Sequence, residues 1–284
     1  MTAAQDLPPL REVILRHGLS ARKALGQNFL LDLNLTRRIA RAAGPLEGAA
    51  VLEVGPGPGG LTRALLLEGA ERVVAVEKDH RCIAALQELE RAFPGRLEIL
   101  EADAMNLVSG FGLPAPARVV ANLPYNISTA LLSGWLESEI WPPWWDSLTL
   151  MFQREVAERL VAEPGSKRYG RLSVLAQWRT YTRILFEVDR RAFTPPPKIT
   201  SSVVQIVPQR MPPDVAPQAL RRLTAAAFGQ RRKMLRTSLA SIVKDPAGLL
   251  ESVDIAPSRR AEEVSVNDYL ALARALGVTP DGSE

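Results

Sequence analysis

The strongest constraint on the fold is an alternation of short apolar runs with segments of helical periodicity in the first half of the chain. Strands that alternate with helices in this way form a parallel sheet with helices packed on its faces. The apolar runs lie at 51–54, 72–76, 97–100, 119–121 and 148–152, and helical patterns at 61–68, 81–93, 128–136 and 154–162. The sequence therefore predicts an α/β fold for this half.

The pattern changes after a proline-rich stretch at 208–217, which follows two closing strands. Beyond this stretch helical periodicity dominates, in segments at 220–228, 232–243, 247–253 and 266–276. We therefore predict a large α/β domain over residues 1–208, including an N-terminal extension, and a small all-helical domain over residues 209–284.

Composition excludes several classes of protein. No apolar run reaches the roughly 18 residues that a membrane span needs, and the N-terminus lacks a secretory segment. The single cysteine, Cys82, excludes an internal disulfide, and the two histidines are too far apart to suggest a metal site. We expect a cytoplasmic monomer that needs no metal and no membrane. A net charge of +4 mildly favours an acidic partner such as nucleic acid.

A glycine-rich turn, in the segment VLEVGPGPGG, follows the first apolar run. Gly55, Gly57 and Gly60 satisfy the dinucleotide pattern G-x-G-x-x-G, and Glu77 lies about twenty residues on, where it would hold a ribose. By itself this pattern is a weak signal. Two prolines in the turn remove amides that a pyrophosphate would bind, and Glu53 would repel it. A nicotinamide cofactor is therefore disfavoured.

Acidic side chains end three successive strands, at Glu53, Glu77 and Asp103. For Glu77 or Asp103 alone, a helix cap is an equally good interpretation. Three such acids in succession favour a cofactor that carries a positive charge and no phosphate. S-adenosyl-L-methionine is such a molecule. Glu77 would accept hydrogen bonds from its ribose hydroxyls and Asp103 from its adenine amino group.

The fourth strand ends in Asn-Leu-Pro-Tyr, within the segment VVANLPYNIS. Asn122 supplies a carbonyl acceptor, and Pro124 biases Leu123 towards an extended backbone. Tyr125 offers a ring on which a base can stack. Ligands of open α/β sheets bind at this end of the strands. The segment is therefore predicted to hold an exocyclic amine on a flat heterocycle.

Four motifs in this order, VLEVGPGPGGLT, VVAVEKD, LEILEADAM and VVANLPYNIS, resemble those of class I methyltransferases that modify adenine N6 with S-adenosylmethionine. Four further segments resemble the small-subunit ribosomal RNA adenine dimethyltransferase family of the KsgA type: KALGQNFLLD, QREVAERLVAEPGSKRYGRLSV, FTPPPKITSSVVQI and FGQRRKMLRTSL. The resemblance covers Lys23 to Leu276.

This resemblance implies a Rossmann-like central sheet with a small helical C-terminal domain. It also implies dimethylation of N6 on two adjacent adenosines near the 3' end of 16S rRNA. The substrate would be the small (30S) ribosomal subunit or its precursor, late in assembly. The cofactor would be S-adenosyl-L-methionine, and the product S-adenosylhomocysteine.

The resemblance also implies which residues form the site. Methyl transfer would involve Asn122, Leu123 and Pro124, with the base stacked between Tyr125 and Phe193. For Phe193, packing before a proline run is an equal alternative. The cofactor would be bound by Gln27, Asn28, Leu30, Glu53, Gly55, Gly57, Glu77, Lys78, Asp103, Ala104 and Asn122.

A basic segment, Gln230 to Arg236, is predicted to open a helix on which Arg232 and Arg236 share one face. Runs of charge are usually only solvated. Further arginines nearby make a phosphate-binding surface the better interpretation. The predicted RNA-binding residues are Arg221, Arg222, Arg231, Arg232, Lys233 and Arg236.

Some alternatives remain open. A tryptophan-rich loop at 141–145 is interpreted as packing against the end of the sheet, with a binding platform as the second choice. The closest rival function is that of the large-subunit rRNA adenine methyltransferase of macrolide resistance, which the basic C-terminal segment disfavours. A non-catalytic assembly or transcription factor is disfavoured by the strand-end residues, and a dehydrogenase by Glu53.

Overall fold

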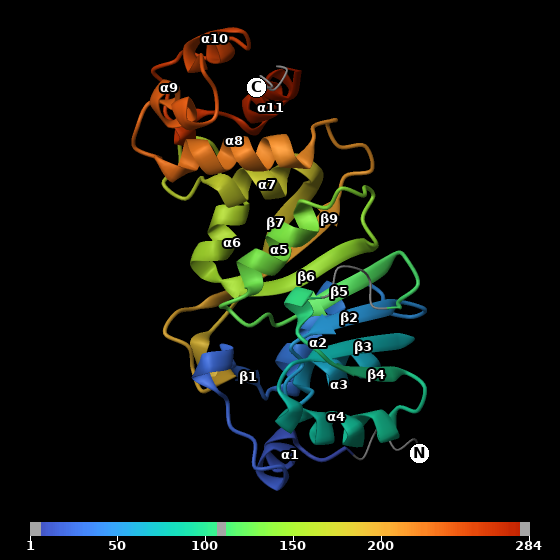
Figure 1. Cartoon of the computed structure of the whole chain (residues 1–284). Coiled ribbons are helices and arrows are strands. Elements are labelled where there is room, and N and C mark those ends of the chain that lie inside the picture. Colours follow the sequence, from blue (N-terminus) through green and yellow to red (C-terminus); the bar gives the residue numbers. More distant parts are fainter. Residues whose placement is uncertain (1–6, 107–111, 279–284) are drawn as a thin grey trace. The chain divides into compact units, whose positions relative to one another are not determined.

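The computed structural model describes residues 7–106 and 112–278 of the chain (Figure 1). The strands are β1 Phe29–Leu30, β2 Ala50–Val54, β3 Arg72–Glu77, β4 Leu97–Glu101, β5 Ala117–Ala121, β6 Trp145–Gln153, β7 Thr180–Val188, β8 Phe193–Thr194 and β9 Ser201–Pro208. The helices are α1 Leu10–Arg16, α2 Leu33–Ala42, α3 Gly60–Leu67, α4 His80–Ala92, α5 Ser128–Leu136, α6 Arg154–Leu160, α7 Arg171–Arg179, α8 Pro217–Gly229, α9 Leu235–Ser238, α10 Pro246–Glu251 and α11 Val266–Val278.

Seven strands form the central sheet, in the order β4-β3-β2-β5-β6-β9-β7. Strands β2 to β6 pair in parallel, and β9 pairs antiparallel to β6. The chain runs outward from β2 to β4 and then returns on the other side of β2 as β5. At such a reversal the carboxyl ends of neighbouring strands flank a crevice that can hold a ligand. The predicted α/β fold is confirmed.

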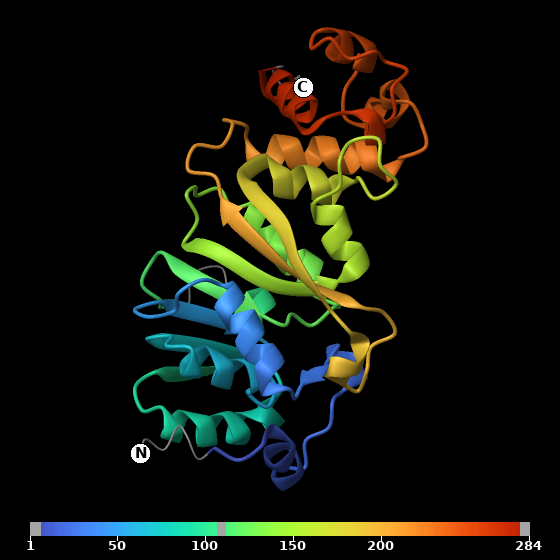
Figure 2. The ribbon, with the colours of Figure 1, turned by 180° about the vertical axis from the view of Figure 1, so that it is seen from behind.

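Helices α2 and α3 pack together on the face of the sheet seen in Figure 2. Their apolar side chains, such as Ile39 and Leu65, join sheet residues such as Val73 and Val120 in one buried cluster. Asp32 caps the N-terminus of α2, since its carboxylate accepts from the backbone amides of Asn34 and Leu35. The core thus packs α2 and α3 against the sheet.

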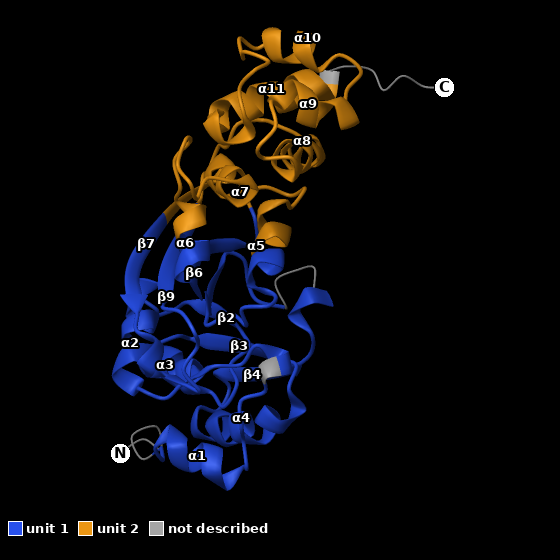
Figure 3. Ribbon diagram, turned by 90° about the vertical axis from the view of Figure 1, so that its left-hand side faces the viewer, with its two compact units in different colours: residues 1–131, 143–157, 183–207 blue, residues 132–142, 158–182, 208–284 orange. Residues whose placement is uncertain are grey.

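Residue contacts divide the chain into two compact units, coloured separately in Figure 3. Unit 1 takes residues up to 131 together with 143–157 and 183–207. Unit 2 takes 132–142, 158–182 and the residues from 208 onward. The predicted division into domains at residue 208 stays a prediction, because compactness alone does not test independent folding. Unit 2 differs from the predicted C-terminal domain in that contacts also join segments 132–142 and 158–182 to the C-terminal helices.

Three aromatic rings explain why an earlier segment joins unit 2. The ring of Phe228, on α8, lies 6.1 Å from that of Tyr169 and 5.6 Å from that of Tyr269 on α11. Both tyrosines are fully buried, and the hydroxyl of Tyr269 donates to the carbonyl of Ala261 over 2.8 Å. Aromatic burial of this size is a major stabilising term. Helices α8 and α11 therefore share a core with residues before α7.

The helix predicted at 232–243 is confirmed only in part. Residues 230–233 form a turn and bend, α9 spans Leu235–Ser238, and a 3₁₀-helix continues over Leu239–Ser241. The chain is extended at Met234, which forms a bridge with Arg260. The Arg231 side chain also donates to the Glu262 carboxylate over 2.7 Å and to the Lys167 carbonyl over 2.9 Å. These tertiary contacts outweigh a helix propensity worth only tenths of a kcal/mol per residue. Arg232 and Arg236 therefore do not share a helix face.

The tryptophan-rich loop packs rather than forming an exposed platform. Trp145 is 1% exposed, at the start of β6. The indole of Trp141 donates to the carbonyl of Gln209 over 2.9 Å. The guanidinium of Arg179 lies 4.8 Å from the Trp141 ring centroid. These contacts agree with the packing interpretation of the loop.

Among the described residues, no helix is both long and apolar enough to cross a membrane.

Candidate active site

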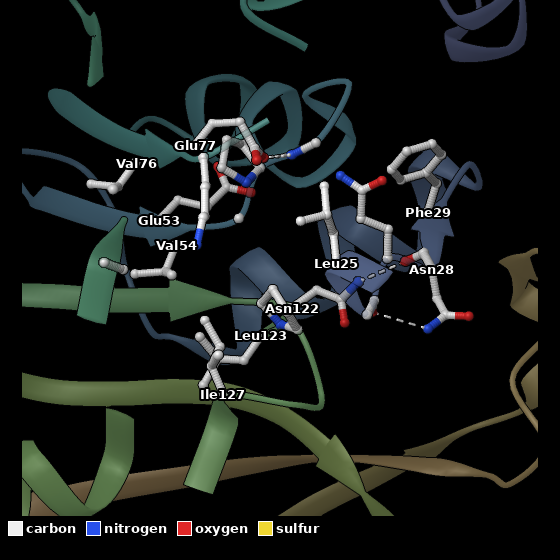
Figure 4. A pocket seen from close by; sticks show the side chains of 18 of the residues that line it. Leu25, Asn28, Phe29, Glu53, Val54, Val76, Glu77, Asn122, Leu123 and Ile127 are labelled. Carbon is white, nitrogen blue, oxygen red and sulfur yellow. Dashed lines mark hydrogen bonds between the residues drawn. The ribbon is translucent and has the colours of Figure 1, made fainter. Parts of the chain in front are cut away.

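A pocket of about 1100 Å³, counting space that opens to solvent, lies in unit 1 at the carboxyl ends of β2 to β5 (Figure 4). One wall is the N-terminal segment 24–30, and the glycine turn after β2 forms another. All the predicted cofactor-binding residues line this pocket. Leu123, Pro124 and Tyr125 line it as well. The structure thus brings together residues from five separate stretches of the chain.

The glycine turn approaches its neighbours too closely for a side chain. Gly55 has φ of +70°, and a Cβ there would lie 3.1 Å from Cδ of Pro124. Gly57 has φ of +56°, and a Cβ there would lie 3.1 Å from the ring of Phe29. Both conformations favour glycine. These glycines let the turn lie directly against β5 and the N-terminal segment.

Glu77 fastens this turn to the end of β3. Its Oε2 accepts from the amide of Gly57 over 2.8 Å, and its Oε1 accepts from the amide of Asp79 over 2.8 Å. The side chain is only 5% exposed, and burial raises its pKa while the two amides act in the opposite direction. Each carboxylate oxygen has a further lone pair with which to accept from a ligand.

Glu53 has a different environment, although it lies beside Glu77 in Figure 4. It is 1% exposed, and its Oε2 has no hydrogen-bond partner among the described residues. Burial raises the pKa of Glu53 to about 8, partly offset by hydrogen bonding to Thr62. An unpaired oxygen of this kind costs free energy until a donor meets it. The pocket wall therefore contains an acceptor that a ligand can satisfy.

Asp103 completes the row of acids. Its Oδ2 accepts from the ammonium of Lys78 over 2.7 Å, and its Oδ1 accepts from the amide of Met105 over 3.0 Å. The hydrogen bond from Lys78 is the main reason why the pKa of Asp103 lies below its usual value. Asp103 is therefore ionised in the neutral pH range.

Asn122, just after β5, has a fixed amide orientation. Its Nδ2 donates to the backbone carbonyl of Asn28 over 3.1 Å, as Figure 4 shows. Because Nδ2 is the donating end, Oδ1 is left as an acceptor. The bond also joins β5 to the N-terminal wall of the pocket, 94 residues away.

Of the two backbone carbonyls next to Asn122 on the C-terminal side, one is already used. The Pro124 carbonyl accepts from the amides of Ile127 and Ser128, each over 3.1 Å. Within the described part of the chain, the Leu123 carbonyl accepts no hydrogen bond. The acceptors left at the strand end are therefore Asn122 Oδ1 and the Leu123 carbonyl.

Tyr125 follows these acceptors in the chain, and its hydroxyl forms a hydrogen bond with Ser201. The Tyr125 and Ser201 hydroxyls lie 2.6 Å apart, and either can donate to the other. Ser201 is fully buried at the start of β9, so the bond fixes the direction of the half-buried ring. Ser201 was not expected from the sequence, although it lies in the segment FTPPPKITSSVVQI.

Comparison with known proteins decides the family. A family model described as ribosomal RNA adenine dimethylase matches residues 18–277. The chain belongs to this family. Among curated relatives of this dimethylase, the ribosomal RNA small subunit methyltransferase A of Azorhizobium caulinodans is 64% identical over 98% of this chain and 96% of its own. The protein of that name from Xanthobacter autotrophicus is 60% identical over 100% of this chain and 99% of its own.

Solved structures show the same fold. A dimethyladenosine transferase from Plasmodium falciparum is similar to this dimethylase with a TM-score of 0.68 and 25% identity. The similarity covers 83% of this chain and 93% of that one. The 23S rRNA methyltransferase ErmE is similar with a TM-score of 0.66 and 26% identity, over 88% of this chain and 100% of its own.

Of the predicted catalytic and cofactor-binding residues, Phe193 is the one that does not line the pocket of the dimethylase. It is 2% exposed and packs in the core cluster with Val188. In β8 it pairs in register with Leu30 of β1. The ring would have to leave the core to stack on a base. The geometry therefore supports the alternative interpretation of Phe193 as a packing residue.

Gln27 lines the pocket, but its side chain is used within the protein. Its Nε2 donates to the Asp79 carboxylate over 3.0 Å, and its Oε1 accepts from the amide of Arg22 over 2.9 Å. Hydrogen bonds from Arg81, and to a smaller extent from Gln27, lower the pKa of Asp79 to about 2. Gln27 thus ties the N-terminal wall to the first turn of α4, an anchoring contact that the sequence did not indicate.

Several pocket residues escaped the sequence analysis. Most are apolar or lack a reactive group, so nothing in their chemistry distinguishes them from core residues. The feature of the sequence that could have identified them is their position next to predicted site residues. They include Leu25, Gly26, Val54, Pro56, Leu61, Val76, Ala102 and Ile127.

The predicted RNA-binding residues, all in unit 2, fall into two groups. Arg231 binds Glu262, Arg222 donates to the Ile242 carbonyl over 3.1 Å, and Arg221 lies 3.8 Å from the Glu137 carboxylate. The other three are exposed, and their side chains have no partner in the described ranges: Arg232, Lys233 and Arg236. The second group, here called the basic turn, is free to contact an external anion.

Proposed function

We propose that this dimethylase transfers methyl groups from S-adenosyl-L-methionine to N6 of two adjacent adenosines near the 3' end of 16S rRNA. The substrate is the small ribosomal subunit or its precursor, and the released product is S-adenosylhomocysteine. The observation that carries the proposal is a pair of acceptors, Asn122 Oδ1 and the Leu123 carbonyl, that no described residue uses and that belong to a pocket lined by acids. We further propose that the enzyme acts as a cytoplasmic monomer.

The chemistry of the pocket lining fits the cofactor. When bound, the cofactor supplies a methyl group on a cationic sulfonium. The unpaired Oε2 of Glu53 suits a cationic ligand, and Glu77 and Asp103 have lone pairs for its hydroxyl and amino groups.

The acceptors at the end of β5 then explain how the adenine is activated. Adenine N6 is a poor nucleophile because its lone pair is delocalised into the ring. If Asn122 Oδ1 and the Leu123 carbonyl accept its two hydrogens, N6 is held with its lone pair turned towards the methyl group. Positioning and electrostatics lower the barrier. No strong base is needed, because the alkylated amine is acidic and loses its proton readily.

Tyr125 is proposed to stack on the target base after it leaves its RNA helix. We expect Tyr125→Ala to lower RNA-dependent turnover about tenfold, since stacking on one aromatic ring is worth about 1–3 kcal/mol, with cofactor affinity almost unchanged. Tyr125→Phe keeps the ring and loses only the bond to Ser201, so it should retain most activity. Equilibrium cofactor binding and single-turnover methylation separate the two steps. A loss confined to cofactor affinity would contradict the stacking role.

One experiment tests the function as a whole. The enzyme and labelled S-adenosylmethionine are incubated in separate reactions with unmethylated small subunits, with large subunits and with naked rRNA. Any dimethyladenosine that forms is then mapped. We expect label on two adjacent adenosines of the small-subunit RNA. Label on large subunits would favour the activity that the name of the similar 23S rRNA methyltransferase describes. An absence of label in every arm would favour a non-catalytic assembly factor.

A further inference from the structure

The three acids of the pocket differ in how their charge is stabilised. Asp103 accepts from the ammonium of Lys78, and Glu77 accepts two backbone amides. Glu53 is buried, and no described residue is a hydrogen-bond partner of its Oε2. A carboxylate is stable in a buried site only if donors or a positive charge meet it. Of the three acids, Glu53 is therefore the one whose ionisation the empty pocket does not support.

The groups around Glu53 bring no positive charge to it. Helix α3 contributes Thr62, whose hydrogen bonding favours the carboxylate without bringing a charge. Strand β3 contributes Glu77, whose negative charge opposes a second negative charge beside it. Within the described residues, no positive charge acts on Glu53 from the elements packed against it. The missing positive charge is one that a ligand can bring.

We propose that Glu53 is protonated in the empty pocket and gives up its proton to solvent when the cationic cofactor binds. Cofactor binding is then coupled to the release of one proton from this carboxyl, whose negative charge balances the charge of the ligand. This inference rests on the proposed function, because it takes S-adenosyl-L-methionine as the ligand.

The pH dependence follows from the sign of the shift. The pKa of Glu53 is raised to about 8, so at pH 7 about nine-tenths of the empty protein carries the proton. A cation that requires the ionised form must then displace about 0.9 proton at pH 7 and almost none above pH 9. Below a pKa of about 8, each pH unit also weakens cofactor binding by up to tenfold.

Isothermal titration calorimetry counts these protons. S-adenosyl-L-methionine is titrated into the full-length enzyme without RNA, in buffers of low and high ionisation enthalpy, at pH 7 and at pH 9.5. The neutral variant Glu53→Gln is measured in the same way. The free ligand is the same in both titrations, so the difference between the two proteins leaves the protons whose release depends on the Glu53 carboxyl. We expect wild type to release about 0.9 proton more than the variant at pH 7, and no more at pH 9.5.

Glu71→Gln is the matched control, because Glu71 is an exposed carboxyl just before the opposite end of β3. It should release as many protons as wild type. Infrared difference spectra of wild type give a second readout that needs no variant, namely the loss of a protonated-carboxyl band on cofactor binding. Tight binding with the same proton count in wild type and Glu53→Gln, or no loss of that band, would overturn the inference. An enzyme that does not bind the cofactor at all would instead overturn the proposed function.

Discussion

Replacing Asn122 with alanine is expected to lower the rate of methyl transfer by about 10²- to 10³-fold, the usual cost of removing one preorganised hydrogen-bonding group from a transition state. The substitution deletes Oδ1, one of the two unused acceptors at the end of β5. Without it, N6 keeps its lone pair in the ring and turns less readily towards the methyl group. The measurement is single-turnover methylation of small subunits at saturating cofactor.

Cofactor affinity should change much less in Asn122→Ala. The variant also loses the bond from Nδ2 to the Asn28 carbonyl, but other contacts hold that wall, including the bond from Gln27 to Asp79. A few-fold weaker binding is therefore expected. Asn34→Ala, an exposed amide on α2, serves as the control and should behave as wild type. Wild-type turnover in Asn122→Ala would remove Asn122 from the proposed mechanism.

Neutralising the basic turn should weaken RNA binding without affecting the cofactor pocket. We expect the double variant Arg232→Gln/Arg236→Gln to bind its RNA substrate about 10- to 100-fold more weakly at moderate salt. Both side chains are exposed and have no partner in the part of the chain that the structure describes. Removing one cation that neutralises a phosphate lowers the slope of log affinity against log salt by about 0.7–0.9. The pair should therefore lower that slope by about 1.5.

The matched control is Arg91→Gln/Arg190→Gln, which removes two exposed arginines from unit 1 and leaves the net charge of the whole protein the same as in the test variant. If overall charge alone drives RNA binding, the two double variants should be equal. If the basic turn contacts phosphate, only the first should lose affinity and salt dependence. An unchanged salt slope in the first variant would contradict the proposed interaction.

The sequence was sufficient for the fold and for the location of the pocket. Periodicity is a local property, so the runs at 51–54, 72–76, 97–100 and 119–121 could be recognised as strands from their own residues. Parallel strands place their carboxyl ends at one edge. Acids and an amide at the ends of successive strands therefore had to meet. The predicted cofactor-binding residues all line one pocket for this reason.

The errors arose where distant segments compete with local preference. The segment at 232–243 has helical periodicity, but Arg231 binds Glu262 and Lys167, and Met234 bridges to Arg260. None of these partners is close in sequence, so local periodicity could not show that contacts with them shorten the helix. Phe193 precedes a proline run that is consistent with either packing or stacking, and the burial of its ring favours packing.

By itself, the sequence determined which strand ends form the site and which polar groups lie there, because strand position and residue type are local. Only the tertiary structure decided the state of each group. The carbonyl of Asn28 orients the amide of Asn122, and the ammonium of Lys78 stabilises the charge of Asp103. Glu53 is buried, and its Oε2 has no partner in the part of the chain that the structure describes. Hydrogen bonding and burial depend on segments far apart in the chain, so they are set when the chain packs.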